Sequence, residues 1–246
     1  MQPFPRRRFL ELTLVSAGAL LGPVACGSDA SAGDLDATRV FPQSLASGDP
    51  RPTSVVLWTR VVDSAHADTD LELSLELATD EGFTQRVSLD GAASRKLRAL
   101  AVFDHCVKTR VEGLTPGTEY FYRFSYARDD ARVTTRTGRT KTAPSEDADV
   151  RVRFAVVSCQ DYAGKYFHAY RKLATLDVDV VVHLGDYVYE TTADPKFQIE
   201  SPERQVKFSK PEQALSLGSG SGAYQAAQSL DNYRDLYRLY RKDPDL

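Results

Sequence analysis

The apolar positions between residues 41 and 142 follow the spacing of short β-strands. Residues 71–77 (LELSLEL) alternate apolar and polar side chains with a period of two, which is typical of a strand with one buried face. Residues 54–61 (SVVLWTRV) are rich in β-branched and aromatic side chains. Further strands are predicted over residues 102–111, 119–126 and, with a solvent-facing pattern of basic residues and threonines, 132–142. Short strands separated by turn signals predict a β-sandwich domain over residues 38–143.

One motif within this region indicates the kind of sandwich. Residues 114–122 (LTPGTEYFY) resemble the turn and strand of fibronectin type III domains, in which a tyrosine hydroxyl bonds back to the upstream backbone. We predict that Tyr120 has this role and that Trp58 fills the sandwich core. His66 and His105 have no matching ligand spacing nearby, so we interpret both as structural or surface residues.

The pattern changes after residues 143–149, which form a polar linker. Residues 152–158 and 178–184 are short apolar runs, and residues 166–176 between them carry apolar side chains at helical spacing. A strand, a helix and a strand in close succession predict a βαβ unit, which implies a parallel sheet. We expect this unit to be the first part of an α/β domain over residues 150–246.

Polar side chains follow both predicted strands at the point where each one ends. Cys159 comes directly after the first strand, and Asp186 follows the second after a glycine. Because ligands gather at the carboxyl ends of parallel strands, we expect the thiol and the carboxylate to project into one crevice. Tyr189 lies three residues beyond Asp186, within reach of folding back over it.

These three side chains point to metal chemistry. A thiolate, a carboxylate and a phenolate are all anionic ligands, and together they suit a highly charged cation such as Fe(III). A carboxylate at a strand end can also bridge two metal ions of the kind that assist phosphoryl transfer. The alternative is that all three residues are purely structural: a buried cysteine, an aspartate that caps a turn and a tyrosine that packs against its neighbours. Physical chemistry alone leaves both interpretations open.

The cysteines allow a second interpretation. Outside the first 26 residues only Cys106 and Cys159 are present, and two cysteines in an exported protein could form one disulfide. The other interpretation assigns Cys159 to a metal and leaves Cys106 as a small buried apolar residue. Composition does not decide between them.

The first 26 residues have the layout of a signal peptide. A basic start precedes a short apolar stretch and small residues before Cys26, and Arg6 to Leu10 (RRRFL) match the twin-arginine pattern. We therefore predict export by the twin-arginine machinery to the periplasm, the cell envelope or the medium. Cys26 leaves two routes open, simple cleavage and attachment of a lipid anchor.

Composition adds little about partners. The chain of 246 residues is 42% hydrophobic and carries a net charge of −3, with both signs interspersed. Because no basic block is present, the sequence gives no support to nucleic-acid-specific binding.

Four separated segments, in the family's order, resemble the PhoD-type alkaline phosphatase/phosphodiesterase family. They are FPQSLASGDPRPTSVVLWTRV (41–61), SCQDYAGKYFHAYRKLA (158–174), VVHLGDYVYE (181–190) and NYRDLYRLYRKDPDL (232–246). The resemblance implies a fibronectin-like β domain followed by a metallophosphoesterase-like α/β domain. It also implies hydrolysis of phosphate monoesters and diesters with Fe(III) and Ca²⁺.

The same resemblance implies roles for individual residues. By motif position Cys159, Asp186 and Tyr189 resemble the family's iron ligands, with Asp186 shared with calcium. No side chain is assigned as catalytic, because a hydroxide on the metals is the expected nucleophile. His183 is interpreted as structural.

The family pattern continues past the helix at residues 232–246 into a longer catalytic domain. We therefore expect this chain to be an N-terminal portion whose catalytic domain is incomplete and which has little activity by itself. Residues 191–230 lack clear periodicity and are expected to be loose. The apolar stripe on the last helix is then expected to have little to pack against: Tyr233, Leu236, Tyr237 and Tyr240.

Two other functions remain open at this stage. A purple acid phosphatase would need an Asp-x-His at the end of the first strand, where Ser158 and Cys159 stand instead. A non-catalytic, exported β-sandwich binding module with a vestigial tail is the other alternative, and independent folding of residues 38–143 together with binding to an envelope ligand would favour it.

Overall fold

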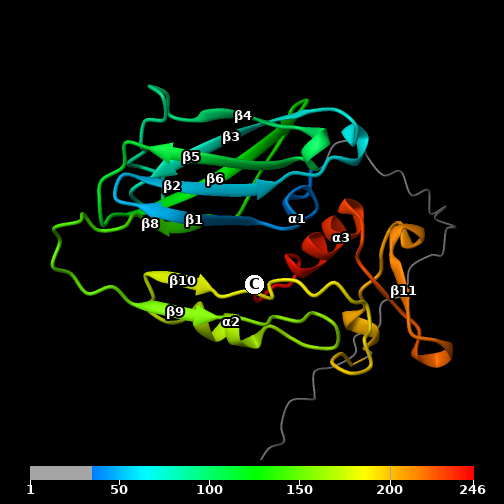
Figure 1. The fold of residues 1–246 in the computed structure, drawn as a ribbon. Helices are drawn as coiled ribbons and strands as arrows, with labels where there is room; N and C mark the ends of the chain where they lie inside the picture. The colour runs from blue at the N-terminus through cyan, green and yellow to red at the C-terminus, as the bar shows by residue number, and fades with distance from the viewer. Residues whose placement is uncertain (1–34, 200) are drawn as a thin grey trace, which may run out of the picture. The chain divides into compact units, whose positions relative to one another are not determined.

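The computed structural model describes residues 35–199 and 201–246 (Figure 1). The predicted signal at residues 1–26, Cys26 included, lies outside these described residues. Residues 35–141 are dominated by antiparallel strands. Its regular elements are α1 (Ala37–Val40), β1 (Leu45–Arg51), β2 (Ser54–Arg60), β3 (Leu71–Ala78), β4 (Arg95–Ala99), β5 (Cys106–Glu112), β6 (Glu119–Arg128), β7 (Ala131–Thr134) and β8 (Gly138–Lys141).

These strands form two sheets with a shared core. One sheet has the order β1-β2-β5, and the other has the order β4-β3-β6-β7, with β8 also paired to β6. Leu57 of the first sheet and Leu75 and Phe124 of the second are fully buried in one cluster. Burying such a side chain stabilises a fold by about 1.5–3 kcal/mol, so the side chains that both sheets contribute to this cluster hold their inner faces together. The region is therefore a β-sandwich-like unit.

The predicted tyrosine corner is confirmed. Tyr120 lies in β6 and is buried, and its hydroxyl oxygen accepts a hydrogen bond of 2.9 Å from the backbone N–H of Thr115. The bond ties the turn before β6 to the strand itself.

The prediction that Trp58 fills the core is wrong. Side chains alternate along β2, so the burial of Val55 and Leu57 turns Trp58 to the outer face of its sheet. There its ring lies under the guanidinium of Arg241, with the Cζ atom 4.1 Å from a ring centroid.

Two strand predictions also need correction. The strand expected over residues 102–111 begins only at Cys106, because residues 101–103 form a 3₁₀ turn and Asp104 and His105 adopt positive φ. The single strand expected over residues 132–142 is two strands, β7 and β8, each paired with β6. Part of this segment is not solvent-facing, since Thr135, Thr140 and Thr142 are buried.

The remaining elements are shorter. They are β9 (Phe154–Val157), α2 (His168–Leu173), β10 (Val180–His183), β11 (Leu215–Leu217), β12 (Tyr224–Ala226) and α3 (Leu230–Tyr240). Short 3₁₀ turns lie at Ser64–His66, Ala101–Phe103, Pro202–Arg204, Pro211–Gln213 and Gly220–Gly222.

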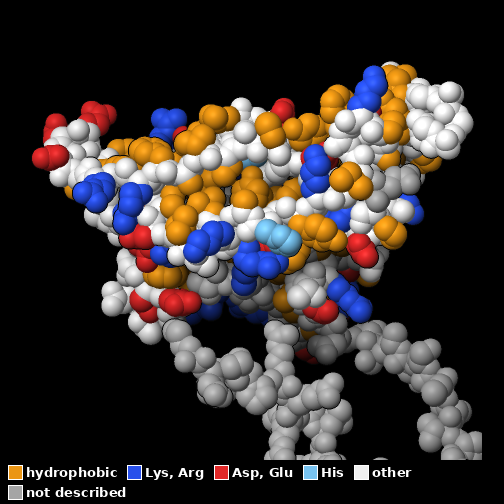
Figure 2. Space-filling model, turned by 90° about the horizontal axis from the view of Figure 1, so that it is seen from below, with side chains coloured by type: hydrophobic (Ala, Val, Ile, Leu, Met, Phe, Trp, Pro, Cys, Tyr) orange, Lys and Arg blue, Asp and Glu red, His pale blue; other side chains and the backbone are white. Residues whose placement is uncertain are grey.

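The predicted strand–helix–strand unit is present with a parallel pair of strands. β9 and β10 pair in register from Phe154↔Val180 to Val157↔His183, and α2 is shorter than the predicted helix. The pair forms a two-stranded sheet, and much of its apolar surface is open: Phe154 and Val156 are each 61% exposed. Figure 2 shows hydrophobic side chains gathered on the face seen from below.

A second buried cluster lies outside the sandwich. Leu236 and Tyr240 of α3 are fully buried in it, and Tyr162 and Phe167, which are also buried, belong to the same cluster. The prediction that the stripe on this helix has little to pack against is therefore wrong for these two residues. Tyr233 and Tyr237, on the other face, remain 40% and 47% exposed.

The expectation that residues 191–230 are loose is wrong as well. Val206 and Phe208 are buried in the second cluster, and the β11–β12 hairpin lies in the same segment. Arg204 is buried and forms an ion pair with Asp243, while its guanidinium stacks 3.6 Å from the ring centroid of Tyr162.

Helix α3 begins at a capping box. The Ser229 side chain accepts from the backbone N–H of Asn232, whose own side chain accepts from the N–H of Ser229. Among the described residues, no helix combines the length and the apolar character needed to span a membrane.

Candidate metal centre

The candidate site lies on two loops at the carboxyl ends of β9 and β10. Because the two strands are parallel and in register, they end level with each other at Val157 and His183. Cys159 follows two residues after β9, and Asp186 follows three residues after β10. The pairing of the strands therefore places both loops at one edge of the sheet.

The three predicted donors converge on one atom. The Cys159 Sγ lies 3.4 Å from Oδ2 of Asp186, and the hydroxyl oxygen of Tyr189 lies 3.3 Å from the same oxygen. The predicted proximity of the thiol, the carboxylate and the phenol is thus confirmed. Cys159 and Asp186 are exposed.

The backbone of both loops is held in an unusual conformation. Cys159 and Asp186 have φ values of 60° and 54°, in the left-handed region that non-glycine residues seldom adopt, and Gly185 has φ 131°. Hydrogen bonds fix these turns: the N–H of Cys159 donates to the carbonyl of Gly185, and the N–H of Gln160 donates to the carbonyl of Asp186, each over 3.1 Å. Strain of about 1–3 kcal/mol per residue is typical of functional sites.

The donors of the site lie close to one another's negative charge. Partial burial, the neighbouring Cys159 thiol and the charge of Asp186 all raise the pKa of Tyr189 above its ordinary value of 10. Among the described residues Asp186 forms no ion pair with a lysine, arginine or histidine. A bound cation would favour the charged form of the Tyr189 phenol and so act against this rise in its pKa.

Side chains from distant parts of the chain hold the loops in place. The hydroxyl of Tyr240, on α3, accepts the N–H of Tyr189 over 3.1 Å. The Gln160 side chain donates to the carbonyl of Tyr187 over 3.0 Å and so ties the two loops together. Buried Asp161 accepts from the Gln198 amide over 3.1 Å.

Sequence reasoning missed Gln160, Asp161 and Tyr240 as supports of the site. The first two stand directly beside Cys159 in SCQD, which is the one local signal that could have drawn attention to them. The sequence marks Tyr240 only as part of an apolar stripe, because nothing local shows that its hydroxyl accepts from the backbone N–H of Tyr189.

His183 contacts the loop backbone. Its Nδ1 accepts a hydrogen bond of 3.2 Å from the N–H of Gly185, and its ring packs edge-on against Tyr187. These contacts agree with a structural role.

Cys106, His66 and His105 have other surroundings in the part of the chain that the structure describes. Cys106 and Cys159 are both free thiols, so the disulfide interpretation is not supported, and burial raises the pKa of the half-buried Cys106. His66 Nδ1 lies 3.1 Å from Asp63, and the ring of buried His105 contacts the carbonyl of Thr69. Within residues 35–199 and 201–246 no group of three or more His, Cys, Asp or Glu side chains is arranged for a metal, so the phenol is essential to the candidate.

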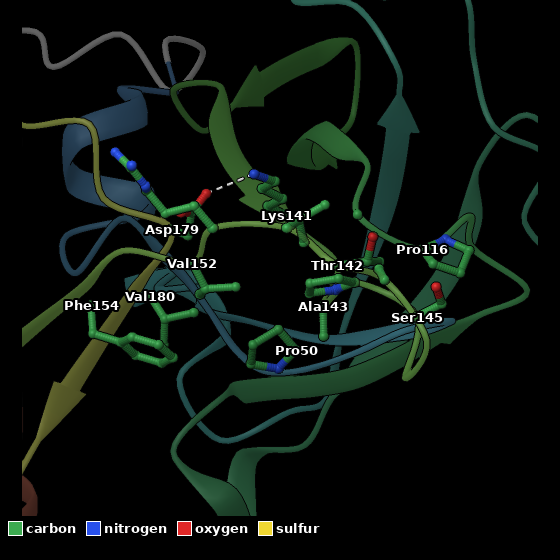
Figure 3. Close-up of a pocket in the computed structure, with 15 residues that line it drawn as sticks. Pro50, Pro116, Lys141, Thr142, Ala143, Ser145, Val152, Phe154, Asp179 and Val180 are labelled. Atoms are coloured by element: carbon green, nitrogen blue, oxygen red, sulfur yellow. Dashed lines mark hydrogen bonds and ion pairs between the residues drawn. The ribbon is translucent and has the colours of Figure 1, made fainter.

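A separate cavity lies beside the sandwich. It has a volume of about 580 Å³ and is bordered by the Lys141–Asp179 ion pair, whose Nζ and Oδ1 atoms are 2.6 Å apart (Figure 3). None of the three donors lines it, so this cavity is not part of the candidate site.

Comparison with known proteins adds an independent observation. Residues 28–144 match the family described as "PhoD-like phosphatase, N-terminal domain", and residues 154–246 match the family described as "PhoD-like phosphatase". The two matches follow each other in the order of the sandwich and the parallel strand pair.

Individual relatives agree with these matches. The chain is 30% identical to "Alkaline phosphatase D" of Bacillus subtilis (strain 168), over 99% of its own length and 39% of that protein. The solved "Structure of PhoD" is similar with a TM-score of 0.66 and 30% identity, over 87% of this chain and 37% of that one. The chain therefore spans about two fifths of the length of the curated relative that it matches.

Proposed function

Because the chain belongs to the PhoD-like phosphatase family, we propose that it serves the hydrolysis of phosphate monoesters and diesters. The observation that supports this most directly is the convergence of a thiol, a carboxylate and a phenol at the carboxyl ends of β9 and β10. We propose Cys159, Asp186 and Tyr189 as ligands of Fe(III), with Asp186 shared with Ca²⁺.

The donor set fits an ion of this kind. Two donors that each lie about 2.0–2.3 Å from one ion are separated by about 3–4 Å, which matches the spacings around Asp186. Both contacts of this carboxylate use Oδ2, and a carboxylate would also supply the hard oxygen donors that Ca²⁺ prefers. The thiolate and the phenolate offer the negative charge that Fe(III) favours.

When bound, the ions would supply Lewis-acid stabilisation of the charge that develops on the phosphoryl oxygens. The residues of the chain would hold the ions, and their backbone and neighbours orient the three donor side chains. Asp186 and Cys159 are fixed by their left-handed backbone, and Tyr189 is fixed by the bond from its N–H to Tyr240. Gly185 has no neighbour within 4 Å of the position where a Cβ would stand, so the loop leaves open space beside the donors.

The non-catalytic alternative stays a prediction, but contacts between α3 and the sandwich weigh against it. Arg238 of α3 donates to Asp104, beside β5, over 2.8 Å, and Arg241 stacks on Trp58 of β2. The sandwich thus contacts the same helix, α3, whose Tyr240 binds the backbone of Tyr189. We propose that the sandwich helps to position the site through this helix.

Metal binding and ester hydrolysis test this function. The protein is loaded with Fe(III) and Ca²⁺, its metal content is measured after dialysis, and turnover of p-nitrophenyl phosphate and bis(p-nitrophenyl) phosphate is followed. We expect retained iron in the parent chain and at least about tenfold weaker retention in Asp186→Asn. Asp177→Asn is the matched control, because Asp177 is an exposed partner of Arg153 away from the donors. Equal iron retention in the parent and Asp186→Asn would contradict the proposal.

We also propose export by the twin-arginine route, on the basis of residues 6–10 (RRRFL) and the apolar stretch that follows. Replacing both Arg6 and Arg7 with lysine is expected to stop export in a host that has this machinery. Labelling with a radioactive fatty acid distinguishes a lipid anchor at Cys26 from simple cleavage. Export of the double variant at the parent level would contradict the proposed route.

A further inference from the structure

Helix α3 has a second face that the candidate metal centre does not use. Leu236 and Tyr240 pack into the buried cluster, whereas another set of side chains, spaced by three or four residues, borders a hollow of about 380 Å³ against the sandwich. We call this hollow between α3 and the sandwich the slot. Its wall on the α3 side consists of Leu230, Tyr233, Arg234, Tyr237, Arg238 and, just after the helix, Arg241. The spacing follows one face of a helix.

Both walls of the slot carry accessible apolar side chains. Trp58 and Phe103 line it from the sandwich, and Phe103 is 61% exposed. Leu230, Tyr233 and Tyr237 line it from the opposite wall, and all three are substantially exposed. Aromatic side chains on facing walls form a site for a flat ring, which gains offset stacking on burial.

The charge in the slot is positive. Four arginines but only one carboxylate, Asp104, line it. The guanidinium groups of Arg60 and Arg238 share this carboxylate, with Nη2 of Arg60 2.8 Å from Oδ1 and Nε of Arg238 2.8 Å from Oδ2. Asp235 offsets part of the charge through a contact of 3.3 Å with Arg238.

The other two arginines are the least neutralised. Arg241 donates to the Tyr187 hydroxyl over 3.2 Å and covers Trp58, and among the described residues it forms no ion pair. Arg234 donates to the carbonyl of Val102, and its nearest carboxylate, Asp231, is 3.9 Å away. A guanidinium of this kind is well suited to a phosphate, which it binds through two parallel hydrogen bonds.

We propose that this slot binds a small anionic ligand that carries an aromatic ring, of the class of the nucleoside phosphates. The ring would lie among Phe103, Tyr233 and Tyr237, beside the Trp58 that Arg241 covers, and the phosphate would meet Arg234 and Arg241. The volume lies in the range of small-molecule sites. Cys159, Asp186 and Tyr189 do not line the slot, so this site is separate from the candidate metal centre and goes beyond the proposed function.

The chain contains a built-in reporter for this site. Trp58 is its single tryptophan, so its fluorescence responds to a ring that binds in the slot. The probe is adenosine 5′-monophosphate, titrated in the presence of EDTA so that no metal-dependent hydrolysis occurs. We expect saturable quenching, and affinities about tenfold weaker for adenosine, which lacks the charge, and for ribose 5-phosphate, which lacks the ring.

Variants separate this slot from the metal centre. Arg234→Gln and Arg241→Met are each expected to weaken binding of the nucleotide about tenfold. Arg98→Gln, which removes an exposed arginine paired with Asp70 on the other sheet, is the matched control and should bind like the parent. Asp186→Asn should also bind like the parent, because its carboxylate does not line the slot.

The affinities of the parent and of each variant are also measured by isothermal titration calorimetry. The heat of binding then gives the affinity of any variant whose fluorescence is altered. The proposal is overturned if neither method detects saturable binding at millimolar nucleotide. It is equally overturned if ribose 5-phosphate binds as well as the nucleotide, or if Asp186→Asn abolishes binding. Tighter binding of a glutamate-rich peptide than of the nucleotide would assign the slot to an acidic protein segment instead.

Discussion

Apolar side chains are buried in the β-sandwich but largely exposed in the parallel strand pair. In the sandwich Leu57, Leu75 and Phe124 are fully buried between two sheets. In the parallel pair Phe154 and Val156 lie mostly in solvent, although the strands are as apolar as those of the sandwich. Strands with a period-two pattern need cover on one face only, which the two sheets of the sandwich give each other, whereas a parallel strand needs cover on both faces before its apolar residues are buried.

The difference shows where the order of the candidate site comes from. The two-stranded sheet contributes little burial, and the loops that carry Cys159 and Asp186 are instead braced by long-range polar contacts. Tyr240, Gln160 and the buried Arg204–Asp243 pair are the main examples. Core packing therefore stabilises the sandwich, whereas in the region of the site long-range hydrogen bonds and ion pairs add to the packing of the smaller cluster around Leu236 and Tyr240.

Truncation of apolar side chains should have very different effects in the two regions. Leu75→Ala is expected to lower the free energy of unfolding by about 4 kcal/mol, because it leaves a cavity in the sandwich core. Val156→Ala is expected to cost less than about 0.5 kcal/mol, since the side chain is already exposed. Urea unfolding measures both. Similar losses for the two variants would remove the contrast between the regions.

The polar bracing of the site region should be sensitive to a single deletion. Asp243→Ala leaves the buried Arg204 guanidinium without its carboxylate and should destabilise this region by about 3 kcal/mol. Hydrogen exchange should then show faster exchange in α3 and around Arg204, with unchanged protection in β3 and β6. Asp177→Ala, in an exposed ion pair, is the control and should have almost no effect. Loss of protection across the sandwich as well would show that the two regions unfold together.

Acid should weaken the sandwich through Asp63. Burial alone would raise the pKa of this carboxyl, but hydrogen bonds from Tyr126 and other neighbours lower it to about 2, from 3.8 in the unfolded chain. A depressed pKa stabilises the folded state above pH 3.8, and this contribution of about 2 kcal/mol is lost as the pH falls toward 2. The decline in unfolding free energy between pH 5 and pH 2 should be shallower in Asp63→Asn. An equal slope in the two proteins would show that Asp63 has an ordinary pKa.

The tyrosine corner should have the smallest of these effects. Tyr120→Phe removes only the hydrogen bond to Thr115 and is expected to cost about 1 kcal/mol. Tyr233→Phe, on the exposed face of α3, should change the unfolding free energy by less than about 0.5 kcal/mol. If the two substitutions lower the free energy of unfolding by the same amount, the hydrogen bond between Tyr120 and Thr115 does not stabilise the sandwich.

Local patterns predicted the elements better than their partners. The alternation in residues 71–77 located β3, and the two apolar runs located the parallel strands and hence the meeting of Cys159 with Asp186. The aromatic character of Trp58 suggests a core position, but its place in the alternation with inward-facing Val55, Leu57 and Thr59 puts it on the outer face.

Contacts between distant residues could not be predicted. Arg204 and Asp243 are 39 residues apart, and a buried arginine in a polar segment without periodicity gives no local signal of its partner. The same holds for Tyr240 and the N–H of Tyr189, 51 residues apart. These pairings depend on how the chain folds back on itself, which single-sequence patterns do not encode.

The measurement that tests the central claim most directly is a titration of the purified protein with Fe(III), followed by visible absorption. If Cys159 and Tyr189 bind the ion together with Asp186, a charge-transfer band from the thiolate and the phenolate should grow to saturation. Tyr189→Phe and Cys159→Ser should each weaken or shift this band, and Tyr233→Phe should leave it unchanged. Absence of a band in the parent protein, or an identical band in all variants, would contradict the assignment of these residues as iron ligands.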